Sequence, residues 1–230
     1  MATEPVNGTF QYRKSLKDTS ATAAKKFDFV DNYLNRPVAS LLVRAVYKTP
    51  ITPNALTYTS FLLGLLGAYF FTRGTYLYFI LGGLITQVSS IVDGADGMLA
   101  RAKNMCSEYG SYLDLFFDRI IDFSLFTCIA VGARIYFNDP NLLFIGVLAS
   151  GLYLLQVNLF YLLKSYLNVD RKGDTGGLRA IIMWLVLIFA VANRLDIFIY
   201  AGAAATAGIV IVRLIYFIRL GKKRSAAEND

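Results

Sequence analysis

The sequence has 230 residues, of which 56% are hydrophobic, and it carries a formal net charge of +7. Its apolar residues come in blocks of about 20, the length that crosses a bilayer, which excludes a soluble globular domain. The chain has no histidine, which excludes His-ligated zinc sites and Ser-His-Asp or Cys-His catalysis, so any enzyme chemistry must rely on carboxylates.

The N-terminal part of the chain divides into two segments. Residues 1–24 show no sustained periodicity and predict a mobile tail. From residue 25, apolar residues recur at helical spacing with Lys and Arg between them, which predicts an amphipathic helix over residues 25–49 in the membrane interface. A helix that binds a partner protein would show the same pattern.

Apolar blocks then predict six transmembrane helices. They are Ala55–Phe71, Tyr76–Val92, Leu115–Phe137, Leu142–Leu163, Leu178–Ala192 and Ile197–Phe217. Thr52 suits the N-cap of the first of these helices, and Pro53 suits its first position. We therefore expect an all-α fold, an integral membrane bundle over residues 50–220 with a cytoplasmic tail at 221–230.

Basic residues predict the orientation of this bundle. With the N-terminus in the cytoplasm, every Lys and Arg except Arg73, Arg134 and Arg194 falls on the cytoplasmic side. The positive-inside rule then predicts cytoplasmic termini, in the cell (inner) membrane, with the acidic stretch described next on the same side.

Four aspartates occupy a stretch at the cytoplasmic end of two predicted spans. Asp93 and Asp96 are three positions apart and Asp114 and Asp118 four apart, so each pair shares one face if both segments are helical. Carboxylates this close would repel one another unless cations lie among them, and all-oxygen ligands favour magnesium, manganese or calcium over zinc.

Small residues and a cation accompany the aspartates. Gly94, Gly97 and Gly110 allow backbone or ligand to approach closely, and Arg101 adds a charge suited to phosphate. A metal-bridged polyphosphate would fit such a site. The alternatives for intramembrane carboxylates are a structural network or the ion path of a cation channel or transporter. Against a channel or transporter, the acidic residues gather at one end of the bundle instead of along several helices.

The pattern D-x-x-D-G-x-x-A-R-x8-G-x3-D-x3-D, formed by residues 93–118, resembles the motif of the CDP-alcohol phosphotransferases. The matching positions are Asp93, Asp96, Gly97, Ala100, Arg101, Gly110, Asp114 and Asp118. The six-span layout, the interfacial helix and "TPN" before the first span are also similar to the family. The resemblance implies transfer of an alcohol-linked phosphate from a CDP-alcohol to a second alcohol, with release of CMP.

The resemblance also implies roles for individual residues. Asp93, Asp96, Asp114 and Asp118 would bind Mg²⁺ or Mn²⁺, two ions per site, and Asp118 would be the general base. The CDP group would contact Asn54, Thr57, Gly97, Ala100, Arg101, Ser107 and Gly110. Asp122, one turn after Asp118, lies outside the motif, and we expect it to support Arg119 or the site.

A predicted cytoplasmic loop and the similarity of one segment bear on the acceptor. The predicted cytoplasmic loop carries Lys164, Arg171, Lys172 and Arg179, which could bind a phosphorylated acceptor or merely set the topology. The chain length and the segment "YLNRPVASLLVRAVYKTPITPN" are similar to the inositol-phosphate branch, which includes enzymes that make di-inositol phosphates from CDP-inositol. We expect an inositol phosphate acceptor and leave the donor open between CDP-diacylglycerol and CDP-inositol. A phosphatidylglycerol-phosphate or phosphatidylserine synthase is the alternative.

The expected partners follow from the same resemblance. They are the CDP-alcohol donor, the acceptor, membrane lipid and a second copy in a homodimer, with no nucleic acid. Small residues between Gly202 and Gly208 could serve the dimer contact or pack the bundle.

Overall fold

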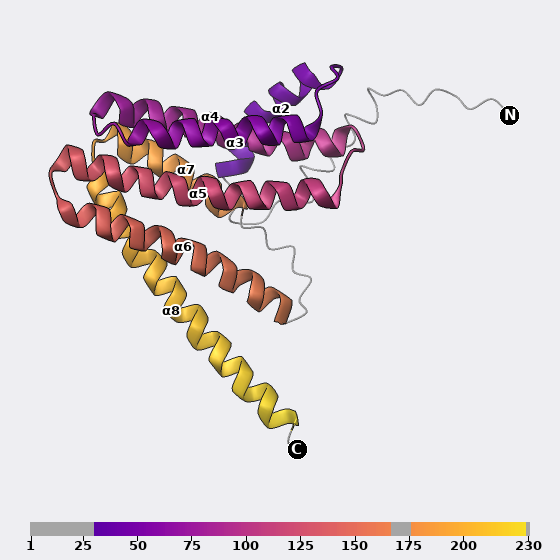
Figure 1. Cartoon of the computed structure of the whole chain (residues 1–230). Coiled ribbons are helices and arrows are strands. Elements are labelled where there is room, and N and C mark those ends of the chain that lie inside the picture. The colour runs from indigo at the N-terminus through magenta and orange to yellow at the C-terminus, as the bar shows by residue number, and fades with distance from the viewer. Residues whose placement is uncertain (1–29, 167–175, 229–230) are drawn as a thin grey trace. The chain divides into compact units, whose positions relative to one another are not determined.

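The computed structural model describes residues 30–166 and 176–228, and every regular element among them is a helix (Figure 1). In chain order these are the π-helical turn η1 (Asp31–Asn35), α2 (Arg36–Val46), α3 (Pro53–Phe71), α4 (Tyr76–Ala102), α5 (Glu108–Phe137), α6 (Pro140–Tyr166), α7 (Gly176–Val191) and α8 (Leu195–Glu228). The predicted all-α class is confirmed. The predicted tail of residues 1–24 lies outside the described residues.

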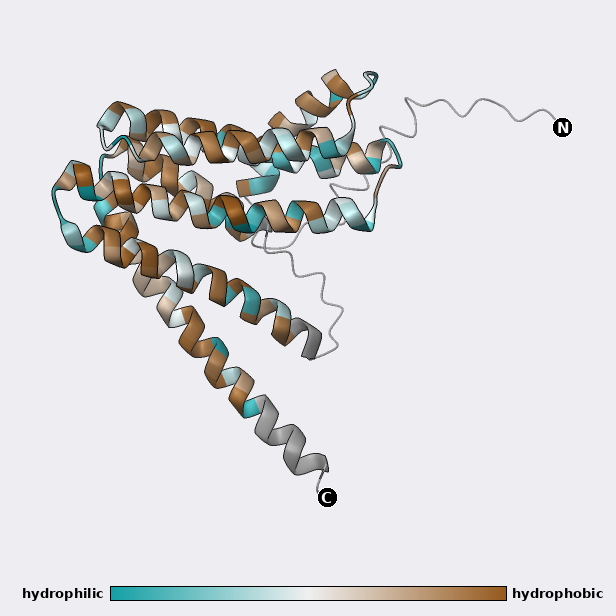
Figure 2. Ribbon diagram, in the orientation of Figure 1, coloured by the Kyte–Doolittle hydropathy of each residue, from teal (hydrophilic) through white to brown (hydrophobic). Residues whose placement is uncertain are grey.

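Five of these helices are long and apolar enough to cross a membrane. They are α3, α4, α5, α6 through Leu163 and α8 through Arg219, and hydrophobic colour dominates much of their length in Figure 2. The apolar part of α7, Leu178–Val191, is shorter. An integral membrane bundle is therefore supported, whereas the count of six spans stays a prediction.

Helices α4 and α5 extend beyond the predicted apolar blocks. Helix α4 continues through the first two aspartates to Ala102, and α5 begins at Glu108, before the second two. Side-chain caps explain two of the helix starts: Thr52 Oγ1 accepts a hydrogen bond from Ala55 N at 3.3 Å, and Ser107 Oγ accepts one from Gly110 N at 3.0 Å. Both acidic segments are therefore helical, and a short turn joins them.

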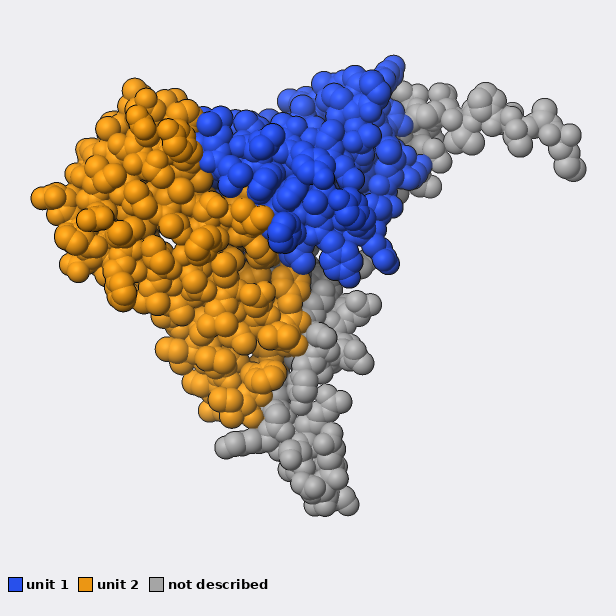
Figure 3. Space-filling view, viewed as in Figure 1, with its two compact units in different colours: residues 1–66, 83–118, 174–187 blue, residues 67–82, 119–173, 188–230 orange. Residues whose placement is uncertain are grey.

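The chain divides into two compact units (Figure 3). The described part of unit 1 comprises residues 30–66, 83–118 and 176–187. Its core holds Ala39 and Val43 of α2 with Val92 and Leu99 of α4, and Ser89 Oγ of α4 donates a hydrogen bond to Ser60 O of α3 at 2.7 Å. In unit 1, α2 and α3 thus both pack on the part of α4 that carries the acidic residues.

The N-terminal helical segment starts with the π-helical turn. Arg36 N donates to Asp31 O there, and Pro37, which has no N–H, lies in the first turn of the α-helix that follows. Ala39 and Val43 are buried, whereas Leu34, Val38 and Leu41 are exposed on another face. The interfacial position of this helix stays a prediction.

Unit 2 comprises residues 67–82, 119–166 and 188–228 in the described part of the chain. Helices α6 and α8 pack together in it. Arg213 Nη1 of α8 donates to Gln156 Oε1 of α6 at 2.8 Å and also to the Gln156 carbonyl. All the motif residues lie in unit 1, so the site can be described within that unit alone.

Candidate active site

Three of the four predicted aspartates converge. Asp93 of α4 and Asp114 and Asp118 of α5 each offer a carboxylate oxygen, and these oxygens lie within 4.8 Å of one another. All three residues are half-buried. The spacing along each helix and the short turn between the helices produce this cluster, as the helical periodicity predicts. We call these three residues the aspartate trio.

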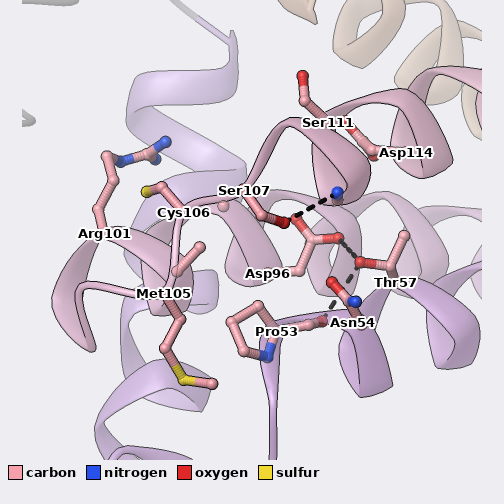
Figure 4. Close-up of a pocket in the computed structure, with 13 residues that line it drawn as sticks. Pro53, Asn54, Thr57, Asp96, Arg101, Met105, Cys106, Ser107, Ser111 and Asp114 are labelled. Atoms are coloured by element: carbon pink, nitrogen blue, oxygen red, sulfur yellow. Dashed lines mark hydrogen bonds between the residues drawn. The ribbon is translucent and has the colours of Figure 1, made fainter.

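The fourth predicted aspartate, Asp96, is not part of the trio. Its side chain is buried, and Oδ2 accepts a hydrogen bond of 2.6 Å from Thr57 Oγ1 of α3 (Figure 4). Thr57 is buried too, and its hydroxyl also lies 3.3 Å from the Pro53 carbonyl. Asp96 therefore belongs to the contact between α3 and α4 and to the pocket beside it.

That pocket has a volume of about 320 Å³. Every residue that the resemblance assigns to CDP lines it: Asn54, Thr57, Gly97, Ala100, Arg101, Ser107 and Gly110. Asp96 and Asp114 line it as well, so Asp114 belongs both to the pocket and to the trio. The starts of α3 and α5 and the end of α4 thus gather the predicted residues in one place (Figure 4).

Sequence reasoning missed Pro53, Met105, Cys106 and Ser111 in the pocket wall. For Ser111 a signal was available, since it follows Ser107 by four residues and precedes Asp114 by three, which places all three on one helix face. Pro53 was assigned only to the start of a helix. Met105 and Cys106 lie between the two helices, where no periodicity applies.

Gly110 lies where two helix starts approach each other closely. A Cβ atom at this position would lie 3.1 Å from Ser107 Oγ and 3.2 Å from Asn54 Oδ1. A larger side chain would therefore displace Asn54 from the pocket wall or break the Ser107 cap. This contact is a packing reason for the glycine that the motif alone does not supply.

Arg179 of α7 joins the trio. Its Nη1 lies 3.0 Å from Asp93 Oδ2 and 2.5 Å from Asp118 Oδ1, and its side chain is 12% exposed. The sequence suggested Arg179 only as a binder of the acceptor or a topology signal. Arg171 and Lys172 lie outside the described residues, and so does the side chain of Lys164. Among the predicted acceptor residues, Arg179 can thus be placed, and it lies between two of the aspartates.

Two further polar contacts flank these helices. Lys103 Nζ, after α4, donates to Thr49 O at 2.8 Å and to Ile51 O at 2.7 Å, which ties the segment before α3 to the end of α4. Sequence reasoning gave Lys103 no such role. In unit 2, Arg119 Nη1 donates to the fully buried Asp122 at 3.3 Å, which is one of the two roles that we expected for Asp122.

The chain matches the sequence model of a known protein family. The model for CDP-alcohol phosphatidyltransferases matches residues 50–218, which include the trio, Asp96 and the whole pocket wall. The chain belongs to this family. The family assignment confirms the resemblance that the motif indicated.

The chain is also similar to curated proteins of the family. It is 37% identical over 121 residues to the bifunctional IPC transferase and DIPP synthase of Thermococcus kodakarensis, a match that covers 53% of this chain and 26% of that protein. It is 40% identical over 96 residues to the archaetidylinositol phosphate synthase of Pyrococcus horikoshii, covering 42% of this chain and 50% of that one. The matched region thus spans about a quarter to a half of these relatives.

A solved structure has the same fold. The phosphatidylinositol phosphate synthase of Mycobacterium tuberculosis superposes with a TM-score of 0.61 at 21% identity, over 75% of this chain and 92% of that one. A second structure of that synthase has CDP-DAG bound, and it superposes equally well at 17% identity. At these identities the likeness shows the fold.

Proposed function

We propose that this CDP-alcohol phosphatidyltransferase transfers an alcohol-linked phosphate from a CDP-alcohol to an inositol phosphate and releases CMP. The observation that carries the proposal is the aspartate trio beside a pocket lined by every residue that the motif assigns to CDP. Family membership favours this transferase over a channel or transporter. The inositol branch is supported by the names of the relatives in Thermococcus and Pyrococcus.

The trio fits a divalent cation. Its donors are carboxylate oxygens alone, the ligand type that Mg²⁺ and Mn²⁺ prefer, and they converge from two helices to within 4.8 Å of one another. Bound there, a divalent cation would supply positive charge against the phosphates of the donor. Asp114 lies in both the trio and the pocket wall, which supports the prediction of a second ion that includes Asp96.

The protein's own residues then have separate tasks. Asn54, Thr57 and the glycine-lined ends of α4 and α5 hold the CDP group, and Arg101 supplies a cation for its phosphates. The acceptor hydroxyl attacks the phosphorus that carries the donor alcohol, the bond from that phosphorus to CMP breaks, and Asp118 takes the hydroxyl proton. CMP leaves with the bridging oxygen, so charge and atoms balance.

Arg179 has two properties that suit a phosphorylated acceptor. Its guanidinium can bind phosphate through two parallel hydrogen bonds, and it already lies beside Asp118, the proposed base. An acceptor phosphate on Arg179 would bring the acceptor hydroxyl near the carboxylate that deprotonates it. We therefore assign Arg179 to the acceptor, with Lys164, Arg171 and Lys172 as further candidates.

The deciding experiment measures CMP release by the purified full chain with Mg²⁺ or Mn²⁺. CDP-diacylglycerol and CDP-inositol are offered separately, each with inositol phosphate, with glycerol phosphate or without an acceptor. We expect release that requires the metal, one donor and inositol phosphate. Release with glycerol phosphate instead would favour a phosphatidylglycerol-phosphate synthase, and no release from any pair would refute the proposed reaction.

Three further predictions concern the membrane spans, the oligomeric state and the location of the protein. They are six membrane spans with α7 as the fifth, a homodimer, and a cell (inner) membrane location with both termini cytoplasmic. Cross-linking in bilayers that yields monomer alone would refute the dimer, and labelling of introduced surface cysteines from each side of the membrane tests the topology.

A further inference from the structure

Asn35 joins three elements of unit 1 through one buried side chain. Its Oδ1 accepts a hydrogen bond from Gln87 Nε2 of α4 at 2.8 Å and another from Trp184 Nε1 of α7 at 3.1 Å. Asn35 is 2% exposed and Gln87 5%. A buried acceptor shared by two donors leaves both of them unsatisfied when it is lost, which is costly where water is excluded.

The backbone fixes Asn35 at this point. It is the last residue of the π-helical turn η1, and α2 follows directly. Ala39 and Val43, one and two turns further along, pack against Val92 and Leu99 of α4. Asn35 is therefore anchored on α4, and its hydrogen bond to Trp184 extends that anchor to α7.

The contact to Trp184 lies close to the contact that Arg179 makes. Gln87 precedes Asp93 by six residues, and Trp184 follows Arg179 by five, so the two residues of each pair are separated by about 7–9 Å along their helix. Helices α4 and α7 are thus antiparallel in unit 1 and are connected at two points: through Asn35, and through the 3.0 Å pair of Arg179 and Asp93. A shift of α7 at the first point moves Arg179 at the second.

Stability alone does not account for these amides. Within the described part of the chain, Asn35 Nδ2 and Gln87 Oε1 are buried without a hydrogen-bond partner. Apolar side chains of similar size would avoid that cost, because two polar groups would no longer be buried. Unlike apolar side chains, the amides supply a directional contact. This contact sets the position of Trp184 and therefore the position of α7.

We propose that Asn35 is a positioning residue: it holds α7 on α4 so that the Arg179 guanidinium stays between Asp93 and Asp118. The kinetic part of this inference rests on the proposed function, whereas the position of Arg179 does not. Because Asn35 acts through Arg179, the loss of Asn35 should change metal binding and the KM for the acceptor only while Arg179 is present. A merely structural residue would lack this dependence.

The first test measures Mn²⁺ binding by electron paramagnetic resonance, which needs no turnover. The four full-length chains are wild type, Asn35→Leu, Arg179→Met and the double variant. Arg179→Met should tighten binding, because it removes a cation from the trio. Asn35→Leu should tighten it about three- to tenfold, the equivalent of one lost hydrogen bond, because Arg179 is then held less firmly. In the Arg179→Met background, Asn35→Leu should change nothing.

The second test measures steady-state CMP release by the same four chains. Asn35→Leu should raise KM for the phosphorylated acceptor about three- to tenfold and leave KM for the CDP donor unchanged. It should add no further loss when Arg179 is already Met. Gln156→Leu removes a buried amide from unit 2 and serves as the matched control, with unchanged Mn²⁺ affinity and unchanged KM values.

Trp184→Phe removes one of the two hydrogen bonds and keeps Asn35, so it replaces Asn35→Leu if that variant does not fold. The positioning role would be overturned if Asn35→Leu had equal effects with and without Arg179, or no effect on either Mn²⁺ binding or KM. In that case, turnover by the wild-type chain would still support the proposed function. Mn²⁺ effects that depend on Arg179, without CMP release from any substrate, would uphold the role of Asn35 and refute the reaction. A wild-type chain that neither binds Mn²⁺ nor releases CMP overturns both.

Discussion

Thr57→Val removes the hydroxyl that holds Asp96 while keeping almost the same side-chain shape. In the structure that hydroxyl lies 2.6 Å from Asp96 Oδ2, and both side chains are buried. A buried acceptor left without its hydrogen bond costs about 1–3 kcal/mol, because no water replaces the lost donor. The expected loss in kcat/KM for the CDP donor is therefore roughly fivefold to a hundredfold.

The assay is metal-dependent CMP release, with a thermal unfolding scan in detergent to exclude loss of folded protein. Thr57→Ser keeps the hydroxyl and should stay within about fourfold of wild type, the cost of a lost methyl group. Ser60→Ala is the matched control, because Ser60 is equally buried on α3 but donates only to the Thr57 carbonyl of its own helix. If Thr57→Val retained wild-type kcat/KM while Asp96→Asn lost activity, the hydroxyl would not hold Asp96 and our argument would be wrong.

Four further substitutions test the site and the packing. Asp118→Asn should abolish turnover but keep metal-dependent CDP binding, measured by calorimetry, whereas Asp93→Asn should weaken both. Near-normal turnover by Asp118→Asn would exclude Asp118 as the base. Gly110→Val should raise KM for the donor at least about fivefold by displacing Asn54, because overpacking costs about 1–3 kcal/mol. Gly151→Ala, with nothing within 4 Å of the added Cβ, should leave KM unchanged. Gly132→Ala should lower the unfolding temperature sharply, because the added Cβ would lie 1.8 Å from Phe71 O. Gly208→Ala should not lower it, because nothing lies within 4 Å of its added Cβ. Equal unfolding temperatures of the two variants would contradict the close approach at Gly132.

The sequence by itself determined the fold class, the family and most of the positions that line the pocket. Apolar blocks and helical spacing are local properties, so they predict α3 to α8 without knowledge of tertiary contacts. The motif is equally local: residues 93–118 form the end of one helix, a turn and the start of the next. Spacing along those two helices places Asp93, Asp114 and Asp118 on faces that can meet, and in the structure their carboxylates do converge.

Only the tertiary structure decided which partners these residues have. Asp96 has the same helical signal as Asp93, yet Thr57, 39 residues away, holds it on the pocket side. Arg179, 86 residues from Asp93, and Asn35, 149 residues from Trp184, take their places through contacts between helices. Local periodicity places a residue on a helix face, but the packing of one helix on another selects the side chain that this face meets.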